Sequence, residues 1–243
     1  MELRGRIGIV TGGGVRVGRA IALGLARSGV DVFIHYNRSA VPAERTAAEA
    51  RDLGVRAAVG SVNLSDPTKA AELVELAEQS LGTPSILVNS ASGFPSDTIS
   101  DVTVDDWRAT FDLTLASPVF ATQAFANALP EDLDGAVVNI TDGRTQRPYR
   151  EHFSYIVAKG GIDTFTKTAA LQLAPQVRVN AVALGVILPP SQEDDDYALR
   201  LAADLPLGRV GGTDPVVATI LSLLENDFIT GEIVRVDGWG HLT

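Results

Sequence analysis

The chain has 243 residues, enough for one large α/β domain or two small ones, with 45% hydrophobic and 21% charged residues, as in an ordinary soluble globular protein. A net charge of −10 argues against a nucleic-acid partner, which requires a basic face, and the absence of cysteine excludes disulfides, thiolate metal sites and a cysteine nucleophile. No apolar run approaches the length of a membrane span and no signal precedes the first strand pattern, so we expect no membrane partner and a cytoplasmic protein.

Strand patterns alternate with helix patterns along the whole chain. The expected strands are residues 6–11, 31–36, 56–59, 85–89, 135–141, 178–183 and 233–236. The expected helices are residues 17–27, 43–53, 66–81, 104–129, 153–173 and 215–224. Such alternation predicts a single α/β domain over residues 1–243, built on a doubly wound parallel sheet with right-handed crossovers and helices on both faces.

Gly12-Gly13-Gly14 joins the first expected strand directly to a helix. Glycines let the backbone approach a pyrophosphate, and the start of the helix supplies free N–H groups. This strand–turn–helix order predicts a dinucleotide phosphate site.

Residues 188–212 form a long polar insertion at the carboxyl edge of the expected sheet. Ligands bind at this edge, so we expect a mobile substrate lid. The acidic run from Glu193 to Asp196 is interpreted as a solvated helix start rather than a metal site, because four consecutive acids cannot all face one ion.

Tyr155 and Lys159 are four residues apart on an expected helix, so their side chains leave one face of it. An ammonium beside a phenol favours the phenolate, so we expect Lys159 to lower the pKa of Tyr155 toward the range of an acid catalyst. A Tyr and a Lys with this spacing also occur by chance on half-exposed helices, so the pair alone does not establish catalysis.

Five motifs occur in the order and spacing of a known family: Thr11-Gly12 with Gly18, Asn89-Ser-Ala-Ser92, Tyr155-x-x-x-Lys159, Asn180-Ala-Val-Ala-Leu-Gly185 and Val236-Asp-Gly238. The chain thereby resembles the short-chain dehydrogenase/reductase family over essentially its whole length. The resemblance implies a Rossmann-type domain, hydride transfer from a nicotinamide, and a homotetramer whose subunits meet through the helices at 104–129 and 153–173.

Within that family, Arg16 replaces the usual middle glycine of the phosphate loop, and Asp142 replaces the usual serine thirteen residues before the tyrosine. With His35-Tyr-Asn-Arg-Ser39 and Asn89-Ser-Ala-Ser-Gly-Phe94, these replacements resemble the pteridine reductase branch. In that branch the loop arginine touches cofactor phosphate and pterin, and the phenylalanine stacks on the pterin ring, roles that fall here on Arg16 and Phe94.

The resemblance also assigns the remaining site residues. Cofactor binding falls on Gly12, Arg16, Val17, His35, Tyr36, Asn37, Arg38, Ser39, Asn63, Leu64, Asn89, Ser90, Ala91, Tyr155, Lys159, Gly185 and Val186. Substrate binding falls on Arg16, Ser92, Phe94, Asp142 and Tyr155, catalysis on Asp142, Tyr155 and Lys159, and no residue is assigned to a metal.

The end of the second strand carries no acid of the kind that selects NAD, and offers Arg38 and Ser39 instead. A guanidinium and a hydroxyl suit a 2′-phosphate, and Arg16 adds positive charge, so we expect NADPH as the cofactor. The alternative is that Arg38 is only a solvated loop residue.

An ionised Asp142 cannot donate a hydrogen bond and would repel a developing oxyanion, which a serine would stabilise. A carboxyl group can pass a proton to a ring nitrogen, directly or through Tyr155, as reduction of a pterin C=N bond requires. The alternative is that Asp142-Gly143 is an ordinary turn.

Three other positions depart from the family pattern. Thr114 stands where an asparagine helps to hold a water leading to the lysine, Leu184 replaces a proline, and Asn63 replaces an aspartate at the adenine.

The leading hypothesis is an NADPH-dependent reductase of a pterin or dihydrofolate-like C=N bond. The alternatives are a carbonyl reductase acting on a ketone or a 3-oxoacyl substrate, and a non-catalytic NADPH-binding protein, which the departure at Thr114 leaves open.

Overall fold

Seven parallel strands form one sheet in the computed structural model, which describes residues 1–189 and 195–242. The strands are β1 (Ile7–Val10), β2 (Asp31–Tyr36), β3 (Ala57–Ser61), β4 (Ile86–Asn89), β5 (Gly135–Asp142), β6 (Val177–Leu184) and β7 (Ile233–Val236). Their order across the sheet is β3-β2-β1-β4-β5-β6-β7, and every neighbouring pair is parallel. The expected doubly wound α/β fold is confirmed.

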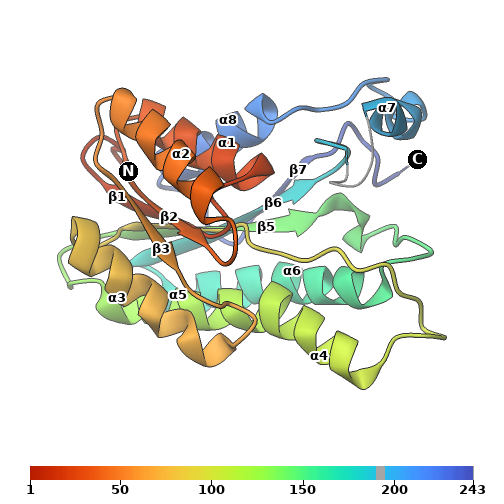
Figure 1. Cartoon of the computed structure of the whole chain (residues 1–243), viewed down its shortest axis with the longest axis horizontal. Helices are drawn as coiled ribbons and strands as arrows, with labels where there is room; N and C mark the ends of the chain where they lie inside the picture. Colours follow the sequence, from red (N-terminus) through yellow and green to blue (C-terminus); the bar gives the residue numbers. More distant parts are fainter. Residues whose placement is uncertain (190–194, 243) are drawn as a thin grey trace.

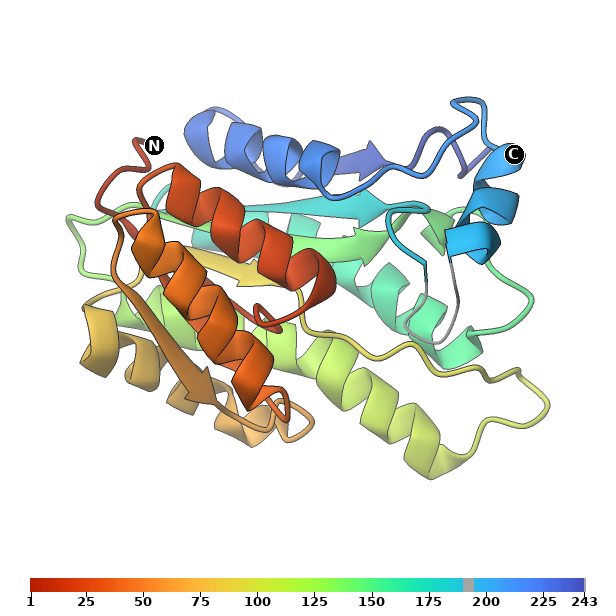
Figure 2. The same ribbon diagram turned by 45° about the horizontal axis from the view of Figure 1, so that its top comes forward.

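Helices cover both faces of this sheet (Figures 1 and 2). They are α1 (Arg16–Arg27), α2 (Ala40–Asp52), α3 (Ala70–Leu81), α4 (Val104–Phe111), α5 (Ser117–Ala128), α6 (Phe153–Leu173), α7 (Asp195–Ala203) and α8 (Asp214–Glu225). Helices α1, α2 and α8 lie on one face, and α3, α4, α5 and α6 lie on the other. No helix in the described ranges is both long and apolar enough to span a bilayer.

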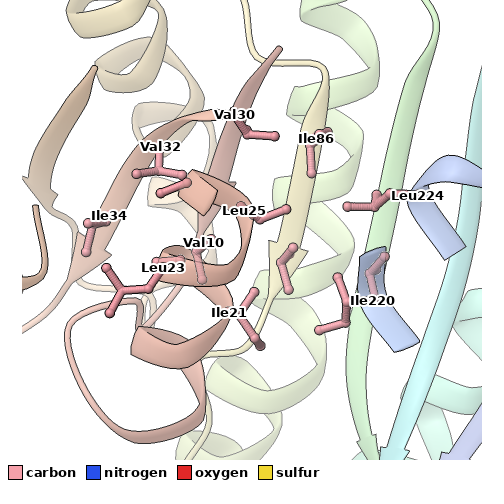
Figure 3. Packing of buried hydrophobic residues seen from close by; sticks show 14 of the residues in the cluster. Val10, Ile21, Leu23, Leu25, Val30, Val32, Ile34, Ile86, Ile220 and Leu224 are labelled. Atoms are coloured by element: carbon pink, nitrogen blue, oxygen red, sulfur yellow. The ribbon is translucent and has the colours of Figure 1, made fainter. Parts of the chain in front are cut away.

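The core is divided into two layers because successive strand residues point to opposite faces. In β1, Val10 packs in the layer under α1 and α8, whereas Ile9 packs in the layer under α3 and α5. Figure 3 shows the first layer, where Ile21 of α1 and Ile220 of α8 point toward each other. Because both faces of the sheet are covered by helices, the central strands are apolar along most of their length and do not alternate between apolar and polar residues.

The single helix expected over residues 104–129 is interrupted by a π-helical segment, Asp112–Ala116. The N–H of Ser117 bonds to the carbonyl of Asp112, five residues back. Pro118 follows, has no N–H to donate, and cannot approach the carbonyl of Thr114 as an α-helix would require. The helix widens at this point, and such segments are frequent at functional sites.

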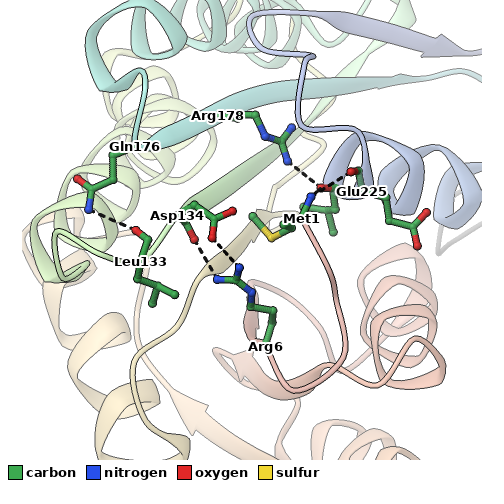
Figure 4. A network of polar contacts seen from close by, with 8 residues as sticks. Met1, Arg6, Leu133, Asp134, Gln176, Arg178 and Glu225 are labelled. Atoms are coloured by element: carbon green, nitrogen blue, oxygen red, sulfur yellow. Dashed lines mark hydrogen bonds and ion pairs between the residues drawn. The ribbon is translucent and has the colours of Figure 1, made fainter.

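At the amino ends of the strands, polar contacts join the start of the chain to α8 (Figure 4). The Met1 ammonium donates to the carbonyls of Leu224 and Glu225, both at 3.0 Å, and Arg178 donates to Leu224 at 2.7 Å. Arg6 pairs with Asp134 at 2.6 Å. The Met1 ammonium and the Arg178 guanidinium place positive charge at the carboxyl end of α8, which complements the helix dipole. These contacts stabilise the fold at this end of the sheet.

Candidate active site

The carboxyl ends of β1, β2 and β4 surround a cavity of about 580 Å³. It lies where the strand order reverses between β1 and β4, the usual ligand position in doubly wound sheets. The lining residues are Gly12, Gly14, Val15, Arg16, Val17, Gly18, His35, Tyr36, Asn37, Arg38, Ser39, Leu64, Ser65, Ser90, Ala91, Ser92 and Leu113. Most of the residues expected at the cofactor therefore meet in one place. Val15, Ser65 and Leu113 have no recognisable signal in the sequence.

The glycines of the first loop leave room that a side chain would fill. Gly12 has φ +65°, and a Cβ there would lie 3.3 Å from the Cα of Ala91. A Cβ on Gly18 would lie 2.2 Å from the carbonyl oxygen of Gly12. This close approach brings the start of α1 against the loop, so the cavity fits a dinucleotide whose phosphates bind to backbone N–H groups.

His35 bonds to the glycine loop after β1 and is almost completely buried. Its Nδ1 accepts from the N–H of Gly12 at 3.2 Å, so Nε2 carries the proton and donates to the carbonyl of Val62 at 2.9 Å. Burial lowers the pKa of His35, so the ring is neutral. Both ring nitrogens bond to backbone, and the side chain positions the loop.

Thr11 fixes the neighbouring loop after β4, a contribution that sequence reasoning missed. Its Oγ1 accepts from the N–H groups of Ser90 at 2.8 Å and Ala91 at 2.9 Å. Thr11 belongs to the first of the five motifs, but nothing in the sequence indicates that its hydroxyl bonds to the loop after β4.

Asn89 is not among the residues that line the cavity, and its side chain turns into the core. Its Nδ2 donates to Asn139 at 2.9 Å, and the residue is buried. Its amide is therefore not in the cavity wall. Asn63 lies at the surface near the cavity, where its Oδ1 accepts from the N–H of Ser65 at 3.2 Å.

Gly185 and Val186 follow β6 and do not line the cavity in this conformation. The N–H of Gly185 donates to the carbonyl of Val236 at 3.0 Å, and the carbonyl of Val186 accepts from the N–H of Gly211 at 2.8 Å. In the insertion at 188–212, Asp195–Ala203 are helical in α7, whereas residues 190–194, including the acids Glu193 and Asp194, lie outside the described residues. The lid and its mobility stay predictions. Among the residues described, no group of three or more His, Cys, Asp or Glu side chains is arranged to hold a metal ion.

Asp142, Tyr155 and Lys159 lie together, as expected, at the end of β5 and on the first turns of α6. The Tyr155 hydroxyl donates to Oδ2 of Asp142 at 3.0 Å, and the N–H of Arg144 donates to Oδ1 at 2.8 Å. Lys159 Nζ donates to the carbonyl of Ile140 at 2.7 Å. The exposed fractions are 7% for Asp142, 8% for Tyr155 and 4% for Lys159, so this is a water-poor site.

The pKa of Tyr155 departs from the sequence-based expectation. Burial and then the charge of Asp142 raise it well above its usual value, and Lys159 does not reverse the shift. The reason is geometric: the hydroxyl is bonded to Asp142, whereas Lys159 Nζ is bonded to a carbonyl and lies 5.6 Å from the centre of the Tyr155 ring. The expectation that the lysine makes this phenol acidic is wrong for the chain alone.

Burial shifts the other two members of the site toward their neutral forms. It raises the pKa of Asp142, against the opposing effects of the Arg144 N–H and the Tyr155 hydroxyl. It lowers the pKa of Lys159 to about 8, against the charges of Asp142 and Asp163. A carboxyl that tends to hold its proton, bonded to a phenol, is a pair able to deliver H⁺ to a bound base.

Lys159→Met should stabilise the protein in the absence of cofactor. At about 1.4 kcal/mol per pKa unit, lowering the pKa from 10.5 to about 8 means that charged Lys159 costs about 3 kcal/mol at neutral pH. Losing the bond to Ile140 offsets about 1 kcal/mol of this gain. Thermal unfolding at pH 7 should show Tm higher by roughly 5 °C.

The pH dependence of this gain identifies its origin. Because the folded-state pKa of Lys159 is depressed, the penalty is complete below about pH 8 and disappears as pH rises toward 10.5. The variant's advantage should therefore shrink over that interval. Lys167→Met, which removes an exposed lysine from the same helix, should change Tm little at any pH. An equal gain in both variants would show that burial is not the cause.

Phe94 lies beside the catalytic pair and is 47% exposed. Its ring meets Tyr155 edge-on at 4.8 Å and stacks on His152 at 3.7 Å between centroids. Asp97, from the same loop, accepts hydrogen bonds from the N–H and the hydroxyl of Ser154 at the start of α6. Asp97 therefore ties the loop that carries Phe94 to the start of the helix that carries Tyr155. Such a contact between distant segments leaves no sequence signal.

Arg16 and Ser92 also reach this region. Arg16 has φ +52°, an uncommon conformation for a residue with a side chain, and its guanidinium donates to the carbonyl of Pro189. Ser92 Oγ lies 3.4 Å from the hydroxyl of Thr114, which the π-helical segment carries to the buried side of its helix. The phosphate loop, the start of the insertion and the π-helical segment thus border one site.

Comparisons with known proteins agree with this geometry. Residues 14–240 match the family model described as enoyl-(acyl carrier protein) reductase. The structure of FolM alternative dihydrofolate reductase 1 from Brucella canis, complexed with NADP, is similar with a TM-score of 0.93 and 36% identity, covering 100% of this chain and 97% of that one. The protein of that name from Brucella suis, in complex with NADP, gives a TM-score of 0.95 at 36% identity with the same coverage.

Relatives with other named activities match over similar lengths. The 3-oxoacyl-(acyl-carrier-protein) reductase of Synechocystis is 31% identical over 241 residues, 97% of each chain. The NADPH-dependent aldehyde reductase-like protein of Arabidopsis thaliana is 31% identical over 258 residues, 98% of this chain and 95% of its own. Together with the Tyr155–Lys159 pair and the glycine loop, these matches show that the chain belongs to the short-chain dehydrogenase/reductase family, in its pteridine reductase-like branch, and is an oxidoreductase using a nicotinamide cofactor.

Proposed function

We propose that the chain is an NADPH-dependent reductase that acts on a C=N bond of a pterin or a dihydrofolate-like substrate. The observation that carries this proposal is the buried carboxyl of Asp142, bonded at 3.0 Å to the hydroxyl of Tyr155. Reduction of C=N needs H⁺ at nitrogen, and a protonated carboxyl can supply it through the phenol. The names of the two Brucella proteins support the same substrate class.

In this proposal, bound NADPH supplies the hydride to carbon. Tyr155 gives its proton to the substrate nitrogen, and Asp142 returns one to the phenol, so the site ends with an ionised carboxylate that is reprotonated from water. Phe94 packs on the substrate ring, while Ser92 and Arg16 border it. Lys159 would hold the nicotinamide ribose, and the residues around the larger cavity would hold the rest of the dinucleotide.

NADPH is the proposed cofactor because Arg38 and Ser39 line the cavity after β2. Arg38→Gln should raise KM for NADPH about ten-fold and leave KM for NADH nearly unchanged, since only the 2′-phosphate is lost as a partner. Initial rates with each cofactor measure this. Arg45→Gln, an exposed arginine outside the cavity, is the control and should change neither KM. Equal effects of Arg38→Gln on both cofactors would contradict a 2′-phosphate contact.

A second candidate, reduction of a ketone or a 3-oxoacyl substrate, is favoured by the named activity of the Synechocystis relative. NADPH oxidation with dihydrobiopterin, dihydrofolate and a simple ketone, measured side by side, separates the two. We expect turnover of the pterins and little turnover of the ketone. The reverse pattern would establish the carbonyl reductase. Binding of NADPH without its oxidation by any of the three substrates would support the non-catalytic alternative. Membership of an oxidoreductase family argues against that alternative.

We also propose that residues 1–243 act as one domain that assembles into a homotetramer through α4, α5 and α6. Three apolar side chains on these helices support this: Val104, Phe120 and Leu171 are all exposed in the single chain. Exposed apolar side chains that lie together mark surfaces where another protein chain binds.

A further inference from the structure

A second cavity, of about 350 Å³, has Arg144 in its wall, the residue whose backbone N–H bonds to Asp142. It lies between the segment that follows β5 and helix α7, two parts of the chain that are far apart in sequence. Its lining residues are Arg144, Arg147, Tyr197, Arg200, Leu201, Asp204 and Leu205. The reaction derived above does not use this cavity.

Three of the lining side chains are arginines, in a protein whose net charge is −10. Within residues 1–189 and 195–242, neither Arg144, Arg147 nor Arg200 makes an ion pair, even though acidic residues are in excess. Like charges gathered around one concave surface repel each other until an anion neutralises them. Asp204 is the one acid among the lining residues that the structure describes, so the arginines outnumber it and the cavity favours an anion.

Aromatic rings hold two of these guanidinium groups. The Cζ of Arg144 lies 5.5 Å from the centre of the Tyr149 ring, and the Cζ of Arg200 lies 5.7 Å from that of Tyr197. Stacking on a ring orders a guanidinium while leaving its N–H groups able to bind a carboxylate. Less side-chain entropy is then lost when an anion binds.

Contacts between residues connect the wall of the arginine cavity with the proposed substrate site. The backbone N–H of Arg144 bonds to Asp142 at 2.8 Å. Tyr149, under Arg144, meets Phe94 edge-on at 6.0 Å, and Phe94 meets Tyr155 at 4.8 Å. A ring bound against Phe94 and Tyr155 would direct a substituent toward the arginines.

We propose that the arginine cavity binds the carboxylates of an extended substrate, so that the preferred substrate is a pterin with an amide-linked, carboxylate-bearing tail, as in dihydrofolate, rather than one with an uncharged tail. This inference rests on the proposed function and narrows its substrate class. Asp204 in the same wall suits such a tail, because an amide-linked amino acid carries an N–H donor as well as carboxylates.

The test compares Arg147→Gln, Arg200→Gln and the double variant, using dihydrofolate and dihydrobiopterin as substrates with saturating NADPH. Both arginines are exposed, so the substitutions should leave the fold intact. We expect each to raise KM for dihydrofolate about ten-fold with kcat unchanged, because only binding of the charged tail is lost. Constants for dihydrobiopterin should stay the same. Added salt should raise KM for dihydrofolate in the parent protein and much less in the double variant.

Arg108→Gln, an exposed arginine on α4 away from the cavity, is the matched control and should change nothing. If dihydrobiopterin and dihydrofolate are both reduced but the cavity variants affect them equally or not at all, the tail site is disproved while the proposed function stands. A lower KM for dihydrobiopterin than for dihydrofolate in the parent protein would have the same meaning. If neither pterin is reduced, the proposed function fails and the tail site fails with it.

Discussion

Tyr155→Phe is expected to lower kcat about 1,000-fold, within the range that a positioned general acid contributes. The substitution removes the only atom of the ring that bonds to Asp142 and keeps the edge-on contact with Phe94. Binding should therefore survive while proton delivery fails. Single-turnover rates of NADPH oxidation with dihydrobiopterin measure the chemical step directly.

Two measurements separate this result from misfolding. The Kd for NADPH and the Tm should both stay close to those of the parent protein, because the ring remains packed in the same place. A variant that retains more than a tenth of the parent rate would mean that another group protonates the substrate.

Asp142→Asn is expected to lower kcat for a pterin substrate about 100-fold, since the amide keeps the size and acceptor atom of the carboxyl but holds no acidic proton. Oδ1 of the amide can still accept from a neighbouring donor, so the loop at Arg144 should keep its place. Asp132→Asn, on an exposed turn, is the control and should leave kcat unchanged.

The pH profile tests the same residue independently. Burial raises the pKa of Asp142, and the carboxyl can give a proton only in its neutral form, so kcat should fall as pH rises through that pKa. The asparagine variant has no such group and should lose this limb of the profile. A dispensable Asp142, or a gain in ketone turnover in Asp142→Ser, would favour the carbonyl reductase instead.

The sequence by itself determined the frame of this site. Apolar runs with strand length and helices with a 3.6-residue period established the order of elements, and the alternation of the two required a parallel, doubly wound sheet. The period also placed Tyr155 and Lys159 on one face of α6, and the glycines after β1 marked the phosphate loop. The type of each element, the face on which a side chain lies and the position of a glycine turn are local properties, because they depend on residues that are close in sequence.

Only the tertiary structure decided how those residues behave. The raised pKa of Tyr155 on α6 depends on water excluded by surrounding elements and on a carboxyl at the end of β5, neither of which a spacing reveals. Asn89 turns inward because Asn139 of the adjacent strand offers an acceptor. The arginine cavity exists because the segment after β5 and helix α7, far apart in sequence, fold against each other. Burial and electrostatic interactions depend on distance in space, and the chain's order does not record that distance.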